Sequence, residues 1–277
     1  MEYQGILDKS VDITRDAGRI VARDFPLGAM EQVGFKGSVN PVTETDTTVE
    51  DLIRSRLERE FPEHRILAEE GGGDVWSEPG RPIWLVDPLD GTNNFAHGFP
   101  HVGVSVALVE GRQPVVGVVF DPLRNEMFTA SLGGGASLNG KTIHASGVDK
   151  LADAFLATGF PYDRRTAPDN NVERLGHFLR RSQGVRRAGA AVLDLCYVAC
   201  GRLDGFWEIR LHPWDVAAGI LIVREAGGEA TDFAGTPDCV SGRRIVASNR
   251  HIHSQMLRVI DEGADAPLPE PVEEDTR

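Results

Sequence analysis

The segment over residues 84–95, WLVDPLDGTNNF, constrains the fold of this chain more than any other part of its sequence. The apolar residues before Asp87 indicate a buried strand, and Pro88 then forces a kinked exit because proline cannot donate to the ladder. Asp90 follows three residues after Asp87, and Gly91 permits a tight turn into a short helix. Two carboxylates at the end of an apolar strand repel each other and lose hydration, so the pattern favours a bound cation over a plain turn.

Two other acidic positions are candidates for the same site. Glu69 and Glu70 follow a predicted strand, and alone they are typical of a solvated strand end. Asp215 lies in the first turn of a predicted apolar helix, where an acid alone stabilises the helix dipole. Carboxylates with a backbone carbonyl offer only hard oxygen ligands, and such a set selects Mg²⁺ or Mn²⁺ over zinc or copper.

Hydrophobic periodicity predicts an α/β protein with an α+β first half. Helices are expected at residues 3–25 and 43–61, followed by an antiparallel meander with strands at residues 65–68, 83–86, 102–109, 115–120 and 127–130. Strands and helices alternate in the second half. Its strands are expected at residues 154–158, 185–187, 205–208 and 245–247. Its helices are expected at residues 170–181, 190–199, 214–226 and 251–261.

A boundary between the two halves is expected near residues 147–151. Residues 1–147 would form an N-terminal α+β half that carries most of the candidate metal ligands, and residues 148–261 would form a C-terminal α/β half. Residues 262–277, EGADAPLPEPVEEDTR, contain six acids and three prolines. This composition predicts a disordered acidic tail.

Residues 135–142, GASLNGKT, match the G-x-x-x-x-G-K-[ST] pattern of a phosphate-binding loop. Such a loop must follow a strand and open a helix, whose N-terminus helps to hold the phosphates. The next residues, IHASG over 143–147, cannot sustain a helix. Asn139 and Gly140, between short apolar segments, instead predict a hairpin turn.

The chain has 277 residues with 29 basic and 42 acidic side chains, which gives a formal net charge of −13. This acidity argues against direct nucleic-acid binding, because phosphate backbones reward a basic surface. The N-terminal segment is charged throughout and no run of about 18 apolar residues occurs, so neither a signal peptide nor a membrane span is expected. With three cysteines in so long a chain, the expected location is the cytoplasm.

Several segments of the sequence resemble the inositol monophosphatase family, within the lithium-sensitive, Mg²⁺-dependent sugar phosphatases. They are residues 68–70 (AEE), 84–95 and 214–228 (WDVAAGILIVREAGG), and residues 185–208 resemble bacterial members in particular. The resemblance extends from about residue 5 to residue 260. It implies a layered αβαβα sandwich of the inositol monophosphatase and fructose-1,6-bisphosphatase type, with the metal site between the two halves.

The resemblance also implies roles for individual residues. The implied metal ligands, for two or three Mg²⁺ ions, are Glu69, Asp87, the Leu89 carbonyl, Asp90 and Asp215. Asp46 and Thr92 would orient and activate the attacking water. The implied substrate contacts are Asp90, Gly91, Thr92, Arg186, Gly189, Ala190, Glu208 and Asp215.

The function that the resemblance implies is hydrolysis of inositol-1-phosphate, or of a similar polyol or sugar monophosphate, by a metal-activated water. Relatives of the same fold act on fructose 1,6-bisphosphate, adenosine 3′,5′-bisphosphate, histidinol phosphate or NADP, so these substrates stay open. A regulatory role beside the bacterial transcription machinery is a further alternative. Besides a small phosphate ester, the partner implied by the family is a second copy of the chain in a homodimer.

Overall fold

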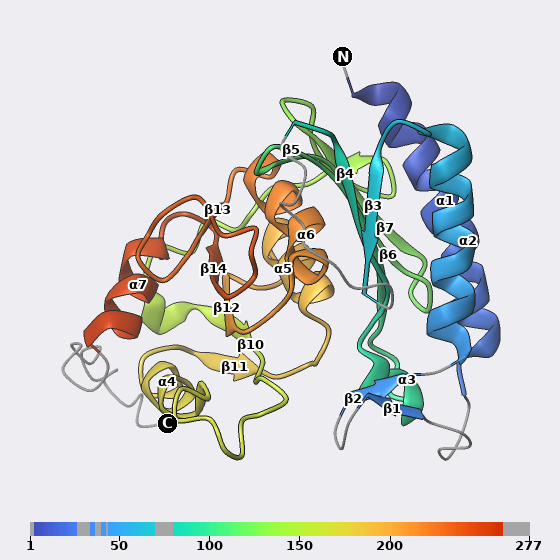
Figure 1. Ribbon diagram of the computed structural model, residues 1–277. Helices are drawn as coiled ribbons and strands as arrows, with labels where there is room; N and C mark the ends of the chain where they lie inside the picture. The colour runs from blue at the N-terminus through green and yellow to red at the C-terminus, as the bar shows by residue number, and fades with distance from the viewer. Residues whose placement is uncertain (1–2, 27–33, 37–39, 43, 70–79, 263–277) are drawn as a thin grey trace.

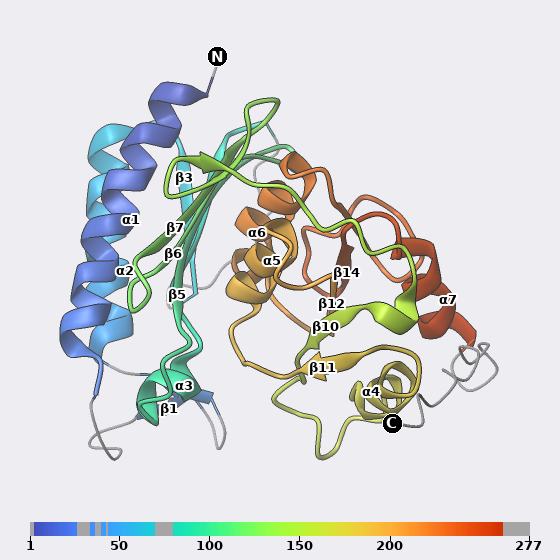
Figure 2. The ribbon, with the colours of Figure 1, turned by 180° about the vertical axis from the view of Figure 1, so that it is seen from behind.

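The computed structural model describes residues 3–26, 34–36, 40–42, 44–69 and 80–262, with the backbone alone for 34–36 and 40–42. Its elements stack as alternating layers of helix, sheet, helix, sheet and helix (Figure 1, and from behind in Figure 2). The layered α/β sandwich expected from the sequence is confirmed. Among the described residues, no helix is both long enough and apolar enough to span a membrane. Glu70 and the predicted tail from residue 263 onward lie outside the described residues.

The helices form three separate layers around the two sheets. They are α1 (Gln4–Asp24), α2 (Glu44–Glu60), α3 (Thr92–Ala96), α4 (Val172–Leu179), α5 (Ala191–Ala199), α6 (Pro213–Glu225) and α7 (His253–Glu262), with a 3₁₀ turn at Leu151–Asp153. α1 and α2 cover the outer face of the first sheet, and α5 and α6 lie between the sheets (Figure 1). α4 and α7 cover the far face of the second sheet.

The first sheet is a meander with one parallel pair. Its strands are, in spatial order, β3 (Arg65–Ala68), β4 (Ile83–Asp90), β5 (Gly103–Glu110), β6 (Gln113–Asp121), β7 (Glu126–Ser131), β8 (Gly135–Leu138) and β9 (Lys141–Thr142). All neighbours are antiparallel except β3 and β4, so the predicted antiparallel pattern is confirmed from β4 onward. The parallel register pairs Ala68 with Val86 and brings the C-terminal ends of both strands to one edge.

The second sheet combines parallel and antiparallel pairs. Its strands are, in spatial order, β11 (Gly184–Arg186), β10 (Phe155–Thr158), β12 (Gly205–Ile209), β14 (Arg244–Ser248) and β13 (Glu229–Thr231). β10 runs parallel to β11 and β12, whereas β14 runs antiparallel to both of its neighbours. A separate antiparallel pair consists of β1 (Gly34–Lys36) and β2 (Asn40–Val42).

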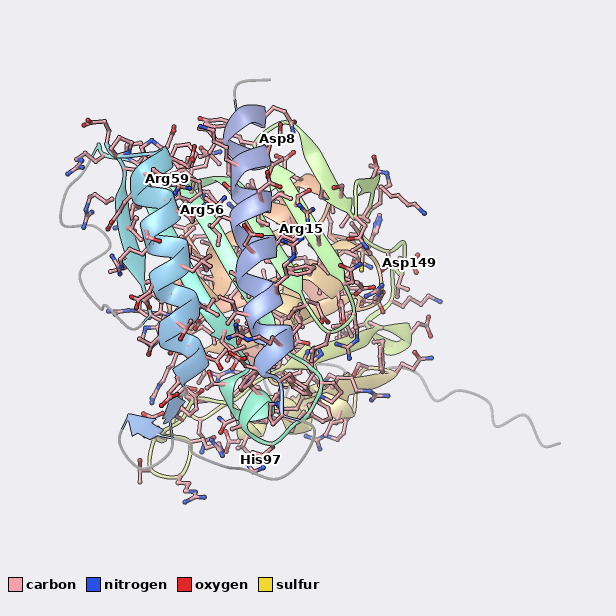
Figure 3. All side chains as sticks on the ribbon, turned by 90° about the vertical axis from the view of Figure 1, so that its right-hand side faces the viewer. Asp8, Arg15, Arg56, Arg59, His97 and Asp149 are labelled. Carbon is pink, nitrogen blue, oxygen red and sulfur yellow. The ribbon has the colours of Figure 1, made fainter. Side chains whose placement is uncertain are left out.

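The layers are held together by three clusters of buried apolar side chains. One lies between the first sheet and α1 and α2, the largest surrounds α5 and α6, and the third lies between the second sheet and α4 and α7. The apolar stripe of α1 faces the first of these clusters. Its other face and that of α2 present charged side chains outward, including Asp8, Arg15, Arg56 and Arg59 (Figure 3). This division is what a helix covering one face of a sheet requires.

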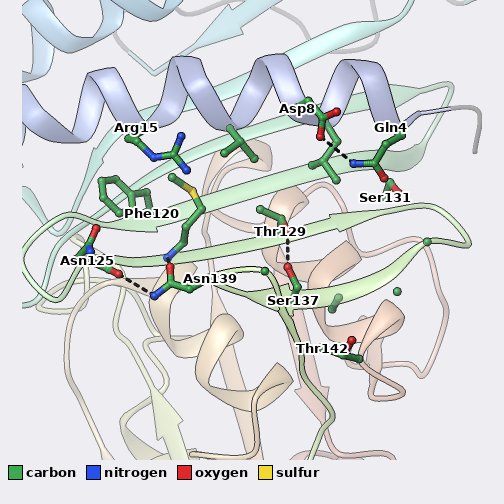
Figure 4. A pocket seen from close by; sticks show the side chains of 17 residues that line it. Gln4, Asp8, Arg15, Phe120, Asn125, Thr129, Ser131, Ser137, Asn139 and Thr142 are labelled. Atoms are coloured by element: carbon green, nitrogen blue, oxygen red, sulfur yellow. Dashed lines mark hydrogen bonds between the residues drawn. The ribbon is translucent and has the colours of Figure 1, made fainter.

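The hairpin predicted at Asn139 and Gly140 is confirmed. Both residues have positive φ angles, 50° and 76°, as a tight turn between β8 and β9 demands. The Asn139 side chain fixes the turn, because its amide donates to the Asn125 carbonyl at 3.0 Å and its oxygen accepts the Met127 N–H at 2.9 Å (Figure 4). No helix follows β9 before residue 151, so the phosphate-loop pattern has no structural counterpart.

The sheet and the central helix α6 approach each other closely at Gly117 in β6. A Cβ built there would lie 2.9 Å from the Ala218 carbonyl oxygen and 3.1 Å from its Cα, both on the α6 backbone. Neither atom can rotate away, so a side chain at this position would push α6 off the sheet.

We therefore expect Gly117→Ala to destabilise the protein by about 1–3 kcal/mol, the usual cost of overpacking a core. Thermal unfolding measures the loss. The matched control is Gly147→Ala, because Gly147 is exposed and a Cβ there would meet no described atom within 4 Å. Equal unfolding temperatures for the two variants would contradict this account of the β6–α6 contact.

Candidate active site

The strand-end carboxylates gather where β3 and β4 finish side by side. Asp87 is 2% exposed, and its Oδ1 accepts the Leu89 N–H at 3.0 Å. The register of β4 with β5 shifts between Asp87 and Asp90, which is where proline interrupts the ladder. Glu69 follows β3 directly, and its N–H donates to the Val86 carbonyl at 3.2 Å. The parallel pairing therefore places Glu69 beside the end of β4.

Helix N-termini orient the other two aspartates. The Asp90 Oδ2 accepts the Val192 N–H at 2.8 Å, in the first turn of α5. The Asp215 Oδ2 accepts the His212 N–H at 2.8 Å, directly before α6. The first N–H groups of a helix have no partner inside the helix, so they are ready donors to a carboxylate. Both contacts hold their carboxylates at the boundary between the sheet and the central helices.

The carboxylates repel one another strongly. Burial raises the pKa of Asp87 well above its usual range, and the charges of Glu69, Asp90 and Asp215 raise it further. Burial, the largest cause, also raises the pKa of Asp90 to about 7 and that of Asp215 to about 8. The pKa of the Tyr162 phenol rises as well, first through burial and then through the same charges. The positive charge of Arg187 acts in the opposite direction on Asp90, but its pKa still lies above the usual range.

The chemistry of this donor set fits Mg²⁺. Carboxylate oxygens and the Leu89 carbonyl are hard ligands, and a divalent cation would remove the repulsion that raises their pKa values. Within the described residues, no three His, Cys, Asp or Glu side chains are already arranged to hold a metal ion.

Thr92 and Asp46 meet beside the carboxylates, although they lie far apart in the sequence. The Thr92 Oγ1 lies 3.3 Å from the Asp46 Oδ1 and 3.0 Å from the Leu89 carbonyl oxygen, and can donate to either. Both side chains are buried. Gly91 precedes Thr92 with φ of 88°, and a Cβ there would lie 2.9 Å from the His101 carbonyl oxygen. Glycine is therefore required for the turn that presents Thr92.

A pocket of about 140 Å³ opens next to these residues. Its walls include the predicted contacts Asp90, Gly91, Thr92, Gly189, Ala190, Glu208 and Asp215, together with Glu69. Glu208 is 8% exposed and lies against Gly159, where any Cβ would overlap its carboxylate. The structure thus brings most of the predicted site residues to one pocket, with Asp87, Leu89 and Asp46 buried behind it.

The predicted substrate-side arginine is the exception. Arg186 points away from the pocket, and its guanidinium stacks 4.4 Å from the centre of the Phe155 ring. Arg187 lines the pocket instead. In a strand, successive side chains point to opposite faces, so Arg186 shares the face of its β10 neighbour Ala157 and of Phe155 while Arg187 faces the other way. The predicted substrate contact of Arg186 therefore stays a prediction, and Arg187 is an additional candidate on the pocket wall.

Other pocket residues were absent from the sequence prediction. Asp194 and Tyr162 both line the pocket, and Asp194 is only 2% exposed. A signal for Asp194 was present, because it is the single acid in the otherwise apolar segment AVLDLCYVA of α5. Tyr162 lies in the loop after β10, where no periodicity indicates a direction.

Comparison with known proteins gives a consistent result. The model of the inositol monophosphatase family matches residues 2–264. An inositol-1-monophosphatase of Mesorhizobium japonicum is 40% identical, over 94% of this chain and 97% of the relative. The Nus factor SuhB of Pseudomonas aeruginosa is 41% identical, over 93% of this chain and 96% of the relative. Among solved structures, the inositol monophosphatase from Anabaena matches with a TM-score of 0.86 and 38% identity, over 97% of this chain and 98% of its own.

These matches extend along the whole described fold. Family membership implies a phosphatase, and the carboxylate pocket lies where the two sheets and the central helices meet. On these grounds the chain belongs to the inositol monophosphatase family.

Proposed function

We propose that this protein is a Mg²⁺-dependent phosphomonoesterase that hydrolyses inositol-1-phosphate or a similar polyol or sugar monophosphate. The observation that carries the proposal is the group of buried, mutually repelling carboxylates beside the Thr92–Asp46 contact. A folded protein tolerates such repulsion where a bound cation relieves it. The same cation would allow a phosphate to enter a pocket that is otherwise negatively charged.

The residues that would hold two or three Mg²⁺ ions are Glu69, Asp87, Asp90, Asp215 and the Leu89 carbonyl. Bound Mg²⁺ supplies Lewis acidity and positive charge for the attacking water, the phosphate and the leaving oxygen. The hydrogen bonds of Asp90 to Val192 and of Asp215 to His212 fix both carboxylates before substrate arrives. Preorganised ligands of this kind lower the cost of assembling the site.

Thr92 and Asp46 would manage the proton of the attacking water. When the Thr92 hydroxyl donates to the Asp46 carboxylate, the lone pairs of its oxygen accept a hydrogen bond from water. Such a contact orients the water and lets its proton pass toward Asp46 as the P–O bond forms. No side chain needs to form a covalent phosphoryl intermediate in this scheme.

The alcohol part of the substrate would lie against the wall that contains Gly189, Ala190 and Glu208. A buried carboxyl such as Glu208 suits a hydroxylated ligand, and relatives at about 40% identity carry the name inositol-1-monophosphatase. Fructose 1,6-bisphosphate, adenosine 3′,5′-bisphosphate, histidinol phosphate and NADP are the alternatives that a panel of phosphate esters would separate.

A regulatory role beside the bacterial transcription machinery is the second candidate. Relatives from Pseudomonas aeruginosa and Salmonella typhimurium, each 41% identical, are named Nus factor SuhB. The two roles are compatible, since one uses the pocket and the other a surface. Rescue of a deletion strain by a variant without phosphatase activity would assign the cellular role to the surface.

Asp90→Asn tests the phosphatase proposal directly. The amide keeps an oxygen that accepts the Val192 N–H, so the fold should persist, but the loss of charge should lower Mg²⁺-dependent phosphate release by at least about 100-fold. Release of inorganic phosphate from inositol-1-phosphate is the measurement, with the exposed Asp153→Asn as a charge-matched control. Turnover close to wild type in Asp90→Asn would overturn the site assignment.

Thr92→Val tests the proton relay. Valine keeps the shape of threonine but removes the hydroxyl, so we expect kcat to fall by about 100-fold, within the usual range for general acid–base catalysis. The Mg²⁺ concentration for half-maximal rate should change by less than about threefold, because the hydroxyl is not a proposed ligand. Thr92→Ser, which keeps the hydroxyl, should recover most of kcat. A shift in Mg²⁺ dependence without loss of kcat would argue against the relay.

The raised pKa values give the metal-free protein a defined pH dependence. In the unfolded chain, Asp90 and Asp215 lose their protons at about pH 4. In the folded protein they keep them until the pH reaches their pKa values, which are about 7 for Asp90 and about 8 for Asp215. The free energy of unfolding therefore decreases over this window and levels off above it.

We expect the unfolding temperature in EDTA to be lower at about pH 8.5 than at about pH 5.5, since the carboxylates are then ionised and repel each other. Added Mg²⁺ should raise it more at the higher pH, where the ligands are deprotonated. Calorimetry of the wild type and of Asp90→Asn measures both effects, and the variant should show a smaller fall in EDTA. Equal stabilisation by Mg²⁺ at both pH values would contradict this electrostatic account.

A further inference from the structure

Asp194 is a buried carboxylate that faces the pocket from α5. Only 2% of the residue is exposed, and that remainder opens into the pocket. Ala190, Ala191 and Asp194 all line the same wall of the pocket. Residues three and four positions apart lie on one face of a helix, so the start of α5 presents these three residues to the pocket together. Every other residue from Val192 to Ala199 is apolar or a buried thiol except Tyr197.

Its carboxylate forms no hydrogen bond or ion pair with any described side chain or backbone group. Burial of a carboxyl without a partner is costly, so such groups are normally satisfied by protein, water or ligand. Because Asp194 opens only toward the pocket, the missing donors must come from what the pocket binds. If this position served packing only, an apolar residue of similar size would cost less free energy to bury than an acid does.

Glu208, on β12, is the neighbour of Asp194 in this wall. It is 8% exposed, and its carboxyl group, like that of Asp194, has no hydrogen-bond partner within the described part of the chain. Both residues line the same pocket, and after burial the charge of Asp194 is the next cause that raises the pKa of Glu208. Gly159 leaves the space that the Glu208 carboxylate occupies. The wall thus presents two buried carboxyl groups that have no hydrogen-bond partner among the described residues.

The charge of Arg187 decides which donors suit this wall. Arg187 lines the same pocket as Asp194 and Glu208. Burial raises the pKa of both carboxyl groups well above the usual range, and the Arg187 guanidinium offsets part of that rise. A cationic ligand such as an ammonium group would be repelled by Arg187 in this wall. Neutral hydroxyl groups are not repelled, and they can donate to the carboxyl groups while accepting from the guanidinium.

We propose that Asp194 and Glu208 together bind two neighbouring hydroxyl groups on the alcohol part of the substrate, which makes Asp194 a specificity-determining residue. This inference rests on the proposed phosphatase function and deepens it. A phosphate ester without hydroxyls would leave both carboxyl groups buried and unpaired. Sites built on hydrogen bonds reject such analogues more strongly than apolar pockets reject a missing methylene.

Three esters of one ring size test the proposal: inositol-1-phosphate, 2-hydroxycyclohexyl phosphate and cyclohexyl phosphate. The measured quantity is kcat/KM for each relative to cyclohexyl phosphate. The wild type should prefer inositol-1-phosphate by about 100-fold or more, with the single hydroxyl giving an intermediate value. In Asp194→Ala this preference should fall at least tenfold, mainly through a higher KM, because the contact exists before and during the reaction.

Two further variants separate hydrogen bonding from structural damage. Asp194→Asn keeps an acceptor oxygen at the same place and should recover part of the preference that Asp194→Ala loses. Asp153→Ala removes an exposed acid outside the pocket and should leave the preference at the wild-type value. Arg187→Gln should increase relative turnover of 2-aminocyclohexyl phosphate, since the positive charge that repels the ammonium is gone.

The outcomes distinguish this inference from the proposed function. No Mg²⁺-dependent release from any of the esters would refute the phosphatase proposal itself. If the wild type hydrolyses the esters but Asp194→Ala loses activity equally on all three, the inference about Asp194 is overturned and the phosphatase proposal stands. Better hydrolysis of the amine than of the hydroxyl ester by the wild type would also overturn it, because the wall would then select a cation.

Discussion

The repulsion among a few buried carboxylates is the constraint on which the rest of this structure depends. Parallel pairing of β3 with β4 puts Glu69 beside the end of the strand that carries Asp87, and α6 adds Asp215. Each of these groups is costly to bury and more costly beside the others. The surrounding fold supplies backbone N–H groups, from Leu89, Val192 and His212, that hold Asp87, Asp90 and Asp215 in place. A bound cation would relieve this repulsion.

Much of the architecture was predictable because its signals are local. Short β-branched apolar runs divided by Gly, Pro and Asp located the central strands β4 to β7, and Asn139-Gly140 located the β8–β9 turn. The parallel pairing of β3 and the short strand β13 (Glu229–Thr231) were not predicted, because both depend on which partners lie adjacent after folding. Helix ends were predicted less well where neither proline nor glycine marks them, as in α4, which is shorter than expected.

The site residues likewise divide into those that a local sequence signal predicts and those whose position depends on contacts formed after folding. The motif over residues 84–95 marked Asp87, Asp90 and Thr92, since each depends on its own short segment. The choice between Arg186 and Arg187 depends on the phase of a three-residue strand, and so short a strand carries almost no periodic signal. Asp194 stood out as one acid in an apolar helix, but only the packing of that helix against the pocket gives it a direction.

Helix packing sets the spacing between the metal side and the alcohol side of the pocket. In the first turn of α5, the Val192 N–H donates to Asp90. Asp194 lies two residues further along the helix, a rise of roughly 3 Å. α6 is locked to α5 at Gly219, where a Cβ would lie 2.6 Å from Leu195 and could not be accommodated. Because α6 also carries Asp215, two rigid helices fix the phosphate-facing and alcohol-facing groups relative to each other. Under the proposed function, Asp194 on α5 and Glu208 on β12 would therefore select the alcohol at a fixed distance from the carboxylates that face the phosphate.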